Sequence, residues 1–309
     1  MGFLKDELSG FIPQEQATEI IKQTTEGSIV MKLARTEQMT SDNKKFPVLT
    51  SKAGAYWVGE GERIKTSGAT WIFPKLEAKK LGVIIPVTKE KLNDASVDVF
   101  GELKEQIAEA FYTAIDSAAL FGTNSPFSTN IFKSISTAGN TITAGTGATY
   151  DLDVSDAMAL VEGDGYDVKA FAAKNGVKNT LRKLRDANGN QLLANGVGGN
   201  EFYNVPIEFA RNGWDATKAD LIGGDFSKYA IFGIRDGIEY EILKEATLQG
   251  TVGTDNKPIS LAEQDMIAIK ATMRVGFLVV RDDAFCAVVP KVEAETPSDP
   301  DKSNEGSNT

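Results

Sequence analysis

Histidine is absent from this chain of 309 residues, and cysteine occurs once. Without histidine the chain cannot build a Ser-His-Asp triad, a Cys-His pair or a histidine-ligated zinc site. The single cysteine, Cys286, cannot form an internal disulfide. Its neighbours in DDAFCAVVP alternate like those of a strand, so we expect a buried thiol with a structural role.

Long hydrophobic runs are also absent. No stretch approaches the roughly eighteen apolar residues that a membrane-spanning helix needs. The first ten residues, MGFLKDELSG, place acidic residues where a secretory signal peptide requires positive charge. We therefore expect no membrane partner, and synthesis inside the cell.

The chain has fewer basic than acidic residues, with 33 Lys and Arg against 43 Asp and Glu. The formal net charge is -10 and the isoelectric point is near 4.8. Contacts to phosphate groups need clustered Lys and Arg, so this balance argues against tight nucleic-acid binding. It is compatible with a shell that surrounds nucleic acid and keeps it away from the wall by repulsion.

The motifs that could carry chemistry are incomplete. GEGERIKTSG contains glycines and a lysine but lacks the GxxxxGK[ST] order of a phosphate-binding loop. RDANGNQLLANGVGG lacks the residue order of a calcium loop, so a turn is the preferred interpretation. Carboxylate pairs such as Asp282 and Asp283 are expected to be solvated, because acidic residues are abundant throughout the chain. The sequence thus predicts no catalytic residue, no cofactor and no metal site.

An extended hairpin is the most informative local feature. The segments that start at Phe46 and end at Leu92 are rich in β-branched and aromatic residues, which favours strands. Between them lies a glycine-rich tip that has no core of its own. We expect Trp57 and Trp71, which flank this tip, to stiffen the arm by cross-strand packing. Four charged tip residues are expected to contact another subunit: Glu60, Glu62, Arg63 and Lys65.

After Val97 the hydrophobic period changes from that of a strand to that of a helix. Leu103, Ile107 and Phe111 fall on one face, which predicts a buried stripe. Gly122 occupies the position of a helix C-cap. The expected helix over 97–121 has about 24 residues and would be roughly 36 Å long.

The remaining segments predict a mixed α and β chain. Pro13 is placed to begin a short helix that Gly27 ends, and 28–41 reads as extended chain. Residues 1–45 hold little that could form a core, so they would lie on a neighbour or pack loosely. The strands of MIAIKATMRVGFLVVRDDAFCAVVP are expected to return and pair with 75–95. The tail after Pro290 is polar and predicts disorder.

These segments, in this order, resemble the major capsid proteins of tailed bacteriophages with the Hong Kong 97 fold. The resemblance covers about 11–290 and is carried by WVGEGERI, FPKLEAKKLGVIIPVTKEKLNDAS, LRKLRDANGNQLL, GGDFSKYAIFGIRDGIEYEI and MRVGFLVVRDDAFCAVV. It implies an α+β fold with these parts: an N-terminal arm at 1–45, an E-loop hairpin at 46–86, a peripheral domain at 87–149 and 256–290 with a spine helix at 97–121, an axial domain at 150–255, and a disordered tail at 291–309.

The resemblance implies a capsid protein that forms pentamers and hexamers of an icosahedral head around double-stranded DNA. Its partners would be copies of itself, a portal protein and, as an open point, a decoration protein. Synthesis would take place in the cytoplasm of a bacterial host. The arm motif starts at Ile12, so a fused scaffolding segment is missing, which implies a separate scaffolding protein or assembly without one.

Some relatives form Lys–Asn cross-links between subunits. Lys65 is a suitable tip lysine, but LAEQDMIAIKATMR contains no asparagine, so no cross-link is expected. Two other functions stay open. One is the shell protein of an encapsulin-like nanocompartment with the same fold, and the other, ranked lower, is an enzyme that uses carboxylates.

Overall fold

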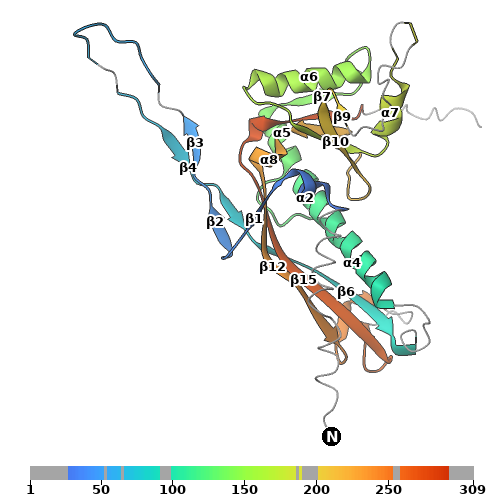
Figure 1. The fold of residues 1–309 in the computed structure, drawn as a ribbon. Helices are drawn as coiled ribbons and strands as arrows, with labels where there is room; N and C mark the ends of the chain where they lie inside the picture. Colours follow the sequence, from blue (N-terminus) through green and yellow to red (C-terminus); the bar gives the residue numbers. More distant parts are fainter. Residues whose placement is uncertain are drawn as a thin grey trace, which may run out of the picture.

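The computed structural model describes residues 27–51, 54–63, 66–90, 99–185, 188–189, 201–252 and 258–291. The helix predicted to begin at Pro13, the tip residue Lys65 and the tail after Lys291 lie outside the described residues. Figure 1 shows a body with two regions of sheet and helix, from which a long hairpin arm projects.

A sheet of four strands forms the lower part of the body in Figure 1, in the order β1-β12-β15-β6. The strand β15 pairs antiparallel with β6, from Met266 opposite Thr88 to Val275 opposite Lys79. The prediction that this segment returns to the 75–95 region is therefore confirmed for its first strand, whereas its second strand, Phe285–Val289, pairs in the other sheet. β6 is an edge strand, which suits Pro86 because proline cannot donate to a ladder. The bounds are β1 Arg35–Gln38, β6 Lys79–Thr88, β12 Ala230–Leu243 and β15 Met266–Val279.

The helix α4, Val99–Asp116, packs along this sheet and continues as a π-helix, η1, over Ser117–Phe121. Leu103, Ile107 and Phe111 are buried. Gly122 ends the run with a φ of 70°, the left-handed conformation that favours glycine at a helix end. The change of hydrogen-bond pattern at Ser117 was not visible in the apolar spacing, because a π-turn alters the pattern over a single turn only.

A second sheet has the order β7-β16-β11-β8-β10-β9 and carries α6 on one side (Figure 1). Its strands are β7 Thr141–Thr143, β8 Ala170–Lys174, β9 Glu201–Phe202, β10 Val205–Ala210, β11 Leu221–Gly224 and β16 Phe285–Val289. The helices around it are α5 Ile131–Ala138, α6 Tyr150–Gly163, α7 Val177–Lys183 and α8 Phe226–Tyr229, and the 3-10 turn η2 spans Asp282–Ala284.

The pairings in these two sheets differ from the expected division of the chain at 150 and 255. The strand β12 comes from the segment expected to be axial, yet it pairs with β15 in the four-stranded sheet. The strands β7 and β16 come from segments expected to be peripheral, yet they join the six-stranded sheet. Strand partners that are distant in sequence cannot be read from local pattern, which explains the difference.

The expectation of extended chain from residue 28 was wrong over its first part. Ile29–Leu33 form a helix, α2, with Ser28 as its N-cap. Ile29, Val30 and Met31 are buried in the main core, so this segment contributes to the subunit's own stability. Tertiary contacts override local propensity here, because a buried carboxylate on α4 accepts hydrogen bonds from the first turn of α2.

Candidate assembly surfaces

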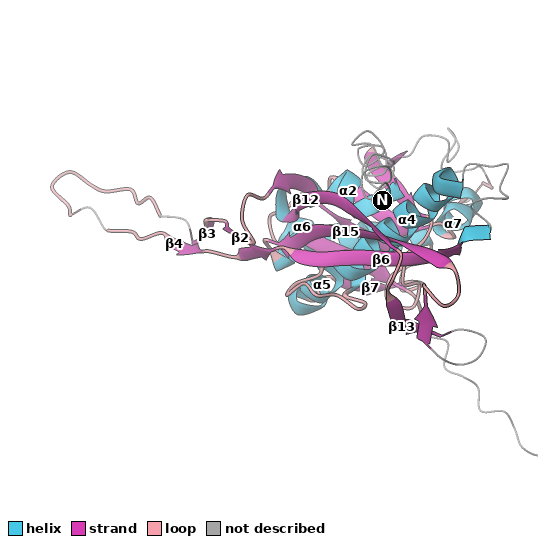
Figure 2. Cartoon of the chain, turned by 90° about the horizontal axis from the view of Figure 1, so that it is seen from below, coloured by secondary structure: helices cyan, strands magenta, loops and turns pink. Residues whose placement is uncertain are grey.

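The arm is a hairpin made of two short paired sections in series (Figures 1 and 2). Near the body, β2 Asn43–Lys45 pairs with β5 Lys75–Glu77. Farther out, β3 Val48–Ser51 pairs with β4 Thr70–Ile72. A small separate hairpin, β13 Thr247–Val252 with β14 Pro258–Ser260, lies elsewhere on the body. Figure 2 shows that the arm points away from the rest of the chain.

The arm exposes large apolar side chains. Trp57 is fully exposed, and Trp71, Ile72 and Phe73 are more than two-fifths exposed. Several large apolar side chains exposed on one projecting element mark an interaction site, because their contact with water is unfavourable. The arm cannot bury these side chains against its own body, since it projects away from it.

The predicted cross-strand packing does not hold for Trp57, which is fully exposed. Trp57 lies beyond the paired sections, and Trp71 is opposite Leu49 in the register of β3 and β4. Cross-strand packing requires the two residues to be directly opposite or diagonal on one face. The two tryptophans are therefore separate exposed groups.

The tip of the arm is a tight turn with charged side chains. The amide of Glu62 donates to the carbonyl of Gly59 at 3.1 Å, and the Glu62 carboxylate accepts from the Gly59 amide at 3.3 Å. Gly61 has a φ of 82°, which a non-glycine residue rarely adopts. Glu60 and Arg63 are exposed beside this turn. The turn fixes its own shape and leaves these charges available to a partner.

The base of the arm is held against the body mainly by the buried side chain of Leu76. Leu76 on β5 is fully buried in a cluster with Met39, where the sheet offers glycines instead of side chains. A Cβ at Gly233 would lie 2.7 Å from Cδ2 of Leu76, and a Cβ at Gly276 would lie 2.7 Å from the carbonyl oxygen of Glu77. The two glycines thus form a socket for Leu76.

Residues next to this socket in the chain form ion pairs. Glu77 accepts from Lys75 at 2.8 Å and from Lys79 at 2.9 Å. The hydrogen bonds from Lys75 and then Lys79 lower the pKa of Glu77 to about 2. Asp42 pairs with Arg235, and at 3.6 Å with Arg274. The exposed pairs add little stability individually, and all of them involve residues of the inner part of the arm or of the strands it joins.

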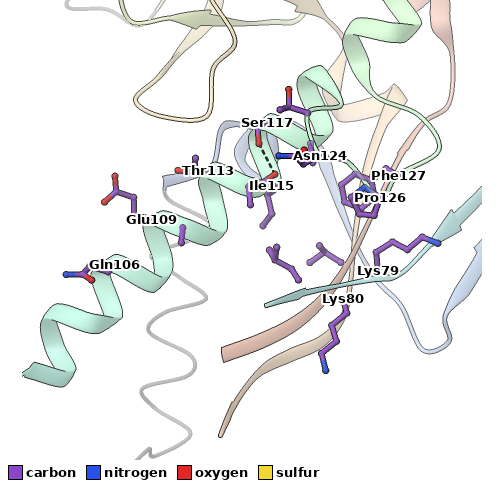
Figure 3. A pocket seen from close by; sticks show the side chains of 16 residues that line it. Lys79, Lys80, Gln106, Glu109, Thr113, Ile115, Ser117, Asn124, Pro126 and Phe127 are labelled. Carbon is purple, nitrogen blue, oxygen red and sulfur yellow. Dashed lines mark hydrogen bonds between the residues drawn. The ribbon is translucent and has the colours of Figure 1, made fainter. Parts of the chain in front are cut away.

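A groove of about 490 Å³ runs between α4 and β6 (Figure 3). Its helical wall presents Ala110, Ala114 and Ala118 at intervals of one turn, and Pro126 and Phe127 line the loop side. Small side chains leave room for a bulky group from elsewhere. Sequence reasoning missed this groove, although the four-residue spacing of the alanines was a signal that could have found it.

The rim of the groove is charged. Lys79 and Lys80 lie on its strand side, and Glu109 lies on its helix side (Figure 3). Lys80 and Glu109 are both exposed. The groove therefore combines an apolar floor with charges of both signs at its edges, which is the usual composition of a protein-binding surface.

A buried carboxylate joins the N-terminal segment to the long helix. Asp116, the last residue of α4, accepts from Ser28 Oγ at 2.7 Å and from the amides of Ile29 and Val30, each at 3.1 Å. Burial raises the pKa of Asp116 to about 6, against the opposing effect of these hydrogen bonds. The contact spans 88 positions of sequence and fixes where α2 begins.

A metal site, a reactive thiol and a membrane span each place their own requirements on the described part of the chain. Over these residues no three His, Cys, Asp or Glu side chains are placed to hold a metal ion. Cys286 is buried as predicted, and burial raises the pKa of its thiol to about 12, so the thiolate form is disfavoured. No helix among the described residues is long and apolar enough to cross a membrane.

The Phage capsid family matches residues 9–289 of the chain. The chain belongs to this family. It is also 37% identical over 288 residues to the major capsid protein of Staphylococcus phage 80alpha, an alignment that covers 93% of this chain and 87% of the relative.

Solved structures agree with the family. A chain from Microbacterium phage Oxtober96 superposes with a TM-score of 0.76 at 29% identity, covering 86% of this chain and 91% of that one. A chain from Mycobacterium phage Adephagia gives a TM-score of 0.75 at 27% identity, covering 87% and 91%. The α+β fold of the Hong Kong 97 type expected from sequence is thereby confirmed.

Within this capsid fold the predicted residues separate into two groups. Leu103, Ile107 and Phe111 lie in the core of the subunit. Glu60, Glu62 and Arg63 belong to the exposed turn of the arm, and the arm projects away from the body (Figures 1 and 2). The groove on α4 and the socket at the arm base are additional features that the sequence analysis did not identify.

Proposed function

We propose that this chain is the major capsid protein of a tailed bacteriophage, which assembles into pentamers and hexamers of an icosahedral head around double-stranded DNA. The observation that carries the proposal is the arm: it exposes Trp57, Trp71 and Phe73, and its own body cannot cover them. In a member of the phage capsid family, the natural cover is another copy of the chain.

The arm and the groove on α4 have complementary chemistry. The arm offers exposed aromatic side chains, and the groove offers a floor of small residues with about 490 Å³ of space. The tip brings Glu60 and Glu62 with Arg63, while the groove rim brings Lys80 and Glu109. We infer that Trp57 of one copy enters the groove of its neighbour, with these charges paired around it. Burial of one aromatic side chain contributes roughly 1.5–3 kcal/mol, and the contact recurs at every copy.

The same proposal assigns roles to the two parts of the body. The four-stranded sheet with α4 would be the peripheral domain, and the six-stranded sheet with α6 would be the axial domain near the centre of each capsomer. The arm at 46–86 would be the E-loop. This assignment follows the observed strand pairings in place of the boundaries at 150 and 255.

The acidic chain would enclose DNA without gripping it, because its net charge of -10 repels the phosphate backbone. The partners would be a portal protein, a separate scaffolding protein and, where present, a decoration protein. Synthesis would take place in the cytoplasm of the bacterial host. A nanocompartment shell would instead require a cargo peptide on its inner wall, and no observation in the described structure favours that alternative.

Sedimentation velocity of the purified protein tests the proposal. We expect the chain to form capsomers or larger shells. A variant in which 54–69 is replaced by a short glycine-serine turn should sediment as a monomer with an unchanged circular dichroism spectrum of the body. If both proteins sediment as compact monomers under all salt and crowding conditions, the proposal is wrong.

A further inference from the structure

The arm carries two Phe-Pro steps, one in each strand: Phe46-Pro47 and Phe73-Pro74. The inner pairing of β2 with β5 and the outer pairing of β3 with β4 share one continuous register up to Leu49. The two steps therefore face one another, with Phe46 opposite Pro74 and Pro47 opposite Phe73. They divide the arm into an inner and an outer section, seen as two successive pairs of strands in Figure 1.

The two strands exchange fewer backbone hydrogen bonds at the Phe-Pro steps than a regular antiparallel pair does. The amide of Phe46 donates to the carbonyl of Pro74 at 3.0 Å. Pro74 has no N–H and cannot return the second bond that an antiparallel pair normally exchanges. Proline also restricts the residue before it to extended conformations, so each strand stays extended across the step. The result is a joint between two stiff sections, because the ladder is weakened while the individual strands remain straight.

The inner section is fixed to the body. Leu76 is fully buried in the socket, and Phe46 and Ala78 pack against the same cluster. The amide of Ala78 donates to the carbonyl of Asp42 at 2.9 Å, and the Asp42 carboxylate pairs with Arg235 on β12. Movement of this section would have to break a buried apolar contact as well as these polar contacts.

The outer section has much weaker ties. Thr70, Trp71 and Ile72 are all exposed. A side chain of the body nevertheless reaches it: the guanidinium of Arg281, which follows β15, donates to the carbonyl of Leu49 on β3. Arg281 is partly buried, and its hydrogen bond joins positions 232 residues apart in sequence.

We propose that the paired Phe-Pro steps are a joint about which the outer arm pivots, and that Arg281 is the latch that holds the orientation seen here. In an icosahedral shell, the arms of copies in different surroundings must meet their neighbours at different angles. That use of the joint rests on the proposed function. The joint itself is a property of the single chain and can be measured without assembly.

Distances between spin labels on the unassembled full-length chain test the joint. One label is placed on α5 by Lys133→Cys, and the second on the outer arm by Thr70→Cys, or on the inner arm by Asn43→Cys as the matched control. Cys286 is buried with a raised pKa, so it should not take up label. For the outer pair we expect a main distance, set by the Arg281 contact, with a broad shoulder from other orientations, and for the inner pair a single narrow distance.

Two further substitutions separate the joint from general looseness. Pro74→Val restores the missing N–H, and the outer distribution should narrow to the width of the inner one. Arg281→Gln removes the latch, and only the outer distribution should broaden. If the outer distribution is already as narrow as the inner one, or if Pro74→Val leaves its width unchanged, there is no joint. If Arg281→Gln has no effect on it, Arg281 is no latch.

Discussion

Gly233 on β12 and Gly276 on β15 lie directly opposite one another, and together they leave the space in which Leu76 of the arm is buried. A methyl group added at Gly276 would meet the backbone oxygen of Glu77 at 2.7 Å, whereas one added at Gly233 would meet the flexible Met39 side chain at 2.6 Å. The arm base and the sheet are thus fitted to each other at the level of single methyl groups.

Gly276→Ala should therefore destabilise the subunit more than Gly233→Ala does, because backbone atoms cannot turn aside as a methionine side chain can. We expect a loss of about 1–3 kcal/mol for Gly276→Ala. The control is Gly237→Ala, also on β12, where a Cβ has nothing within 4 Å. Chemical denaturation of the three variants measures their free energies of unfolding and so gives their order of stability. Equal stability of Gly276→Ala and Gly237→Ala would show that the socket is not tight.

Arg63→Glu should leave the subunit folded and impair shell formation. Arg63 is exposed on a tip without a core, so we expect its partner on another copy. An exposed pair contributes only about 0–1 kcal/mol, but the reversal recurs at every copy and adds repulsion. Circular dichroism and electron microscopy give the readouts. Loss of fold, or assembly equal to that of the unmodified chain, would contradict the role of the tip.

Leu103→Asp is the matched contrast. Leu103 is buried on α4, so a carboxylate placed there would lose contact with water. Burying an unpaired charge costs several kcal/mol, so the subunit should unfold. A folded Leu103→Asp subunit would mean that this face of α4 is not part of the core.

In a double variant with Trp57→Cys and Ala110→Cys, oxidation should form disulfides that link neighbouring chains. If Trp57 of one copy enters the groove of the next, the two cysteines meet between copies, and a denaturing gel without reductant should show a ladder. Each single variant should run as one chain, since Cys286 is buried. Absence of a ladder from assembled particles would place the arm elsewhere.

Unmodified particles should give single-chain bands on the same gel, because the returning segment lacks the asparagine that a Lys65 cross-link needs.

Asp116 should make the stability of the subunit depend on pH. Its pKa is raised from 3.8 to about 6 on folding, so the folded state binds the proton more tightly. Its contribution to stability is therefore most favourable below about pH 4 and declines as the pH rises to about 6. Asp116→Asn cannot offer two acceptor oxygens and should be less stable at every pH, but without this slope.

The measurement for Asp116 is chemical denaturation of unassembled subunits at pH 4.5 and pH 7.5. The stability difference between the unmodified chain and Asp116→Asn should be larger at pH 4.5, by at most about 3 kcal/mol. A difference that does not change with pH, or that grows toward pH 7.5, would show that Asp116 is ionised without cost in the folded chain.

Much of this fold could be predicted from local pattern. The spacing of Leu103, Ile107 and Phe111 gave the buried face of α4, and Gly122 gave its end, because period and capping are local properties. The return of β15 to β6 followed from two apolar segments that needed partners. Order and similarity of the segments indicated the capsid fold.

Other features depend on contacts that no local pattern contains. The helix α2 forms where Asp116 accepts its first amides, a contact that spans 88 positions. Long-range pairing decides which sheet β12 joins. The socket for Leu76 likewise requires two glycines on different strands to lie opposite one another. The predicted cross-strand packing of Trp57 failed because a position near the tip in sequence does not show where the strand pairing ends.

Electron microscopy of the purified protein tests the central claim most directly. The account predicts closed icosahedral shells in which each arm lies on a neighbouring copy, with density for Trp57 in the groove between α4 and β6. Particles that remain compact monomers in every condition, or shells in which the arm folds back on its own body, would contradict it.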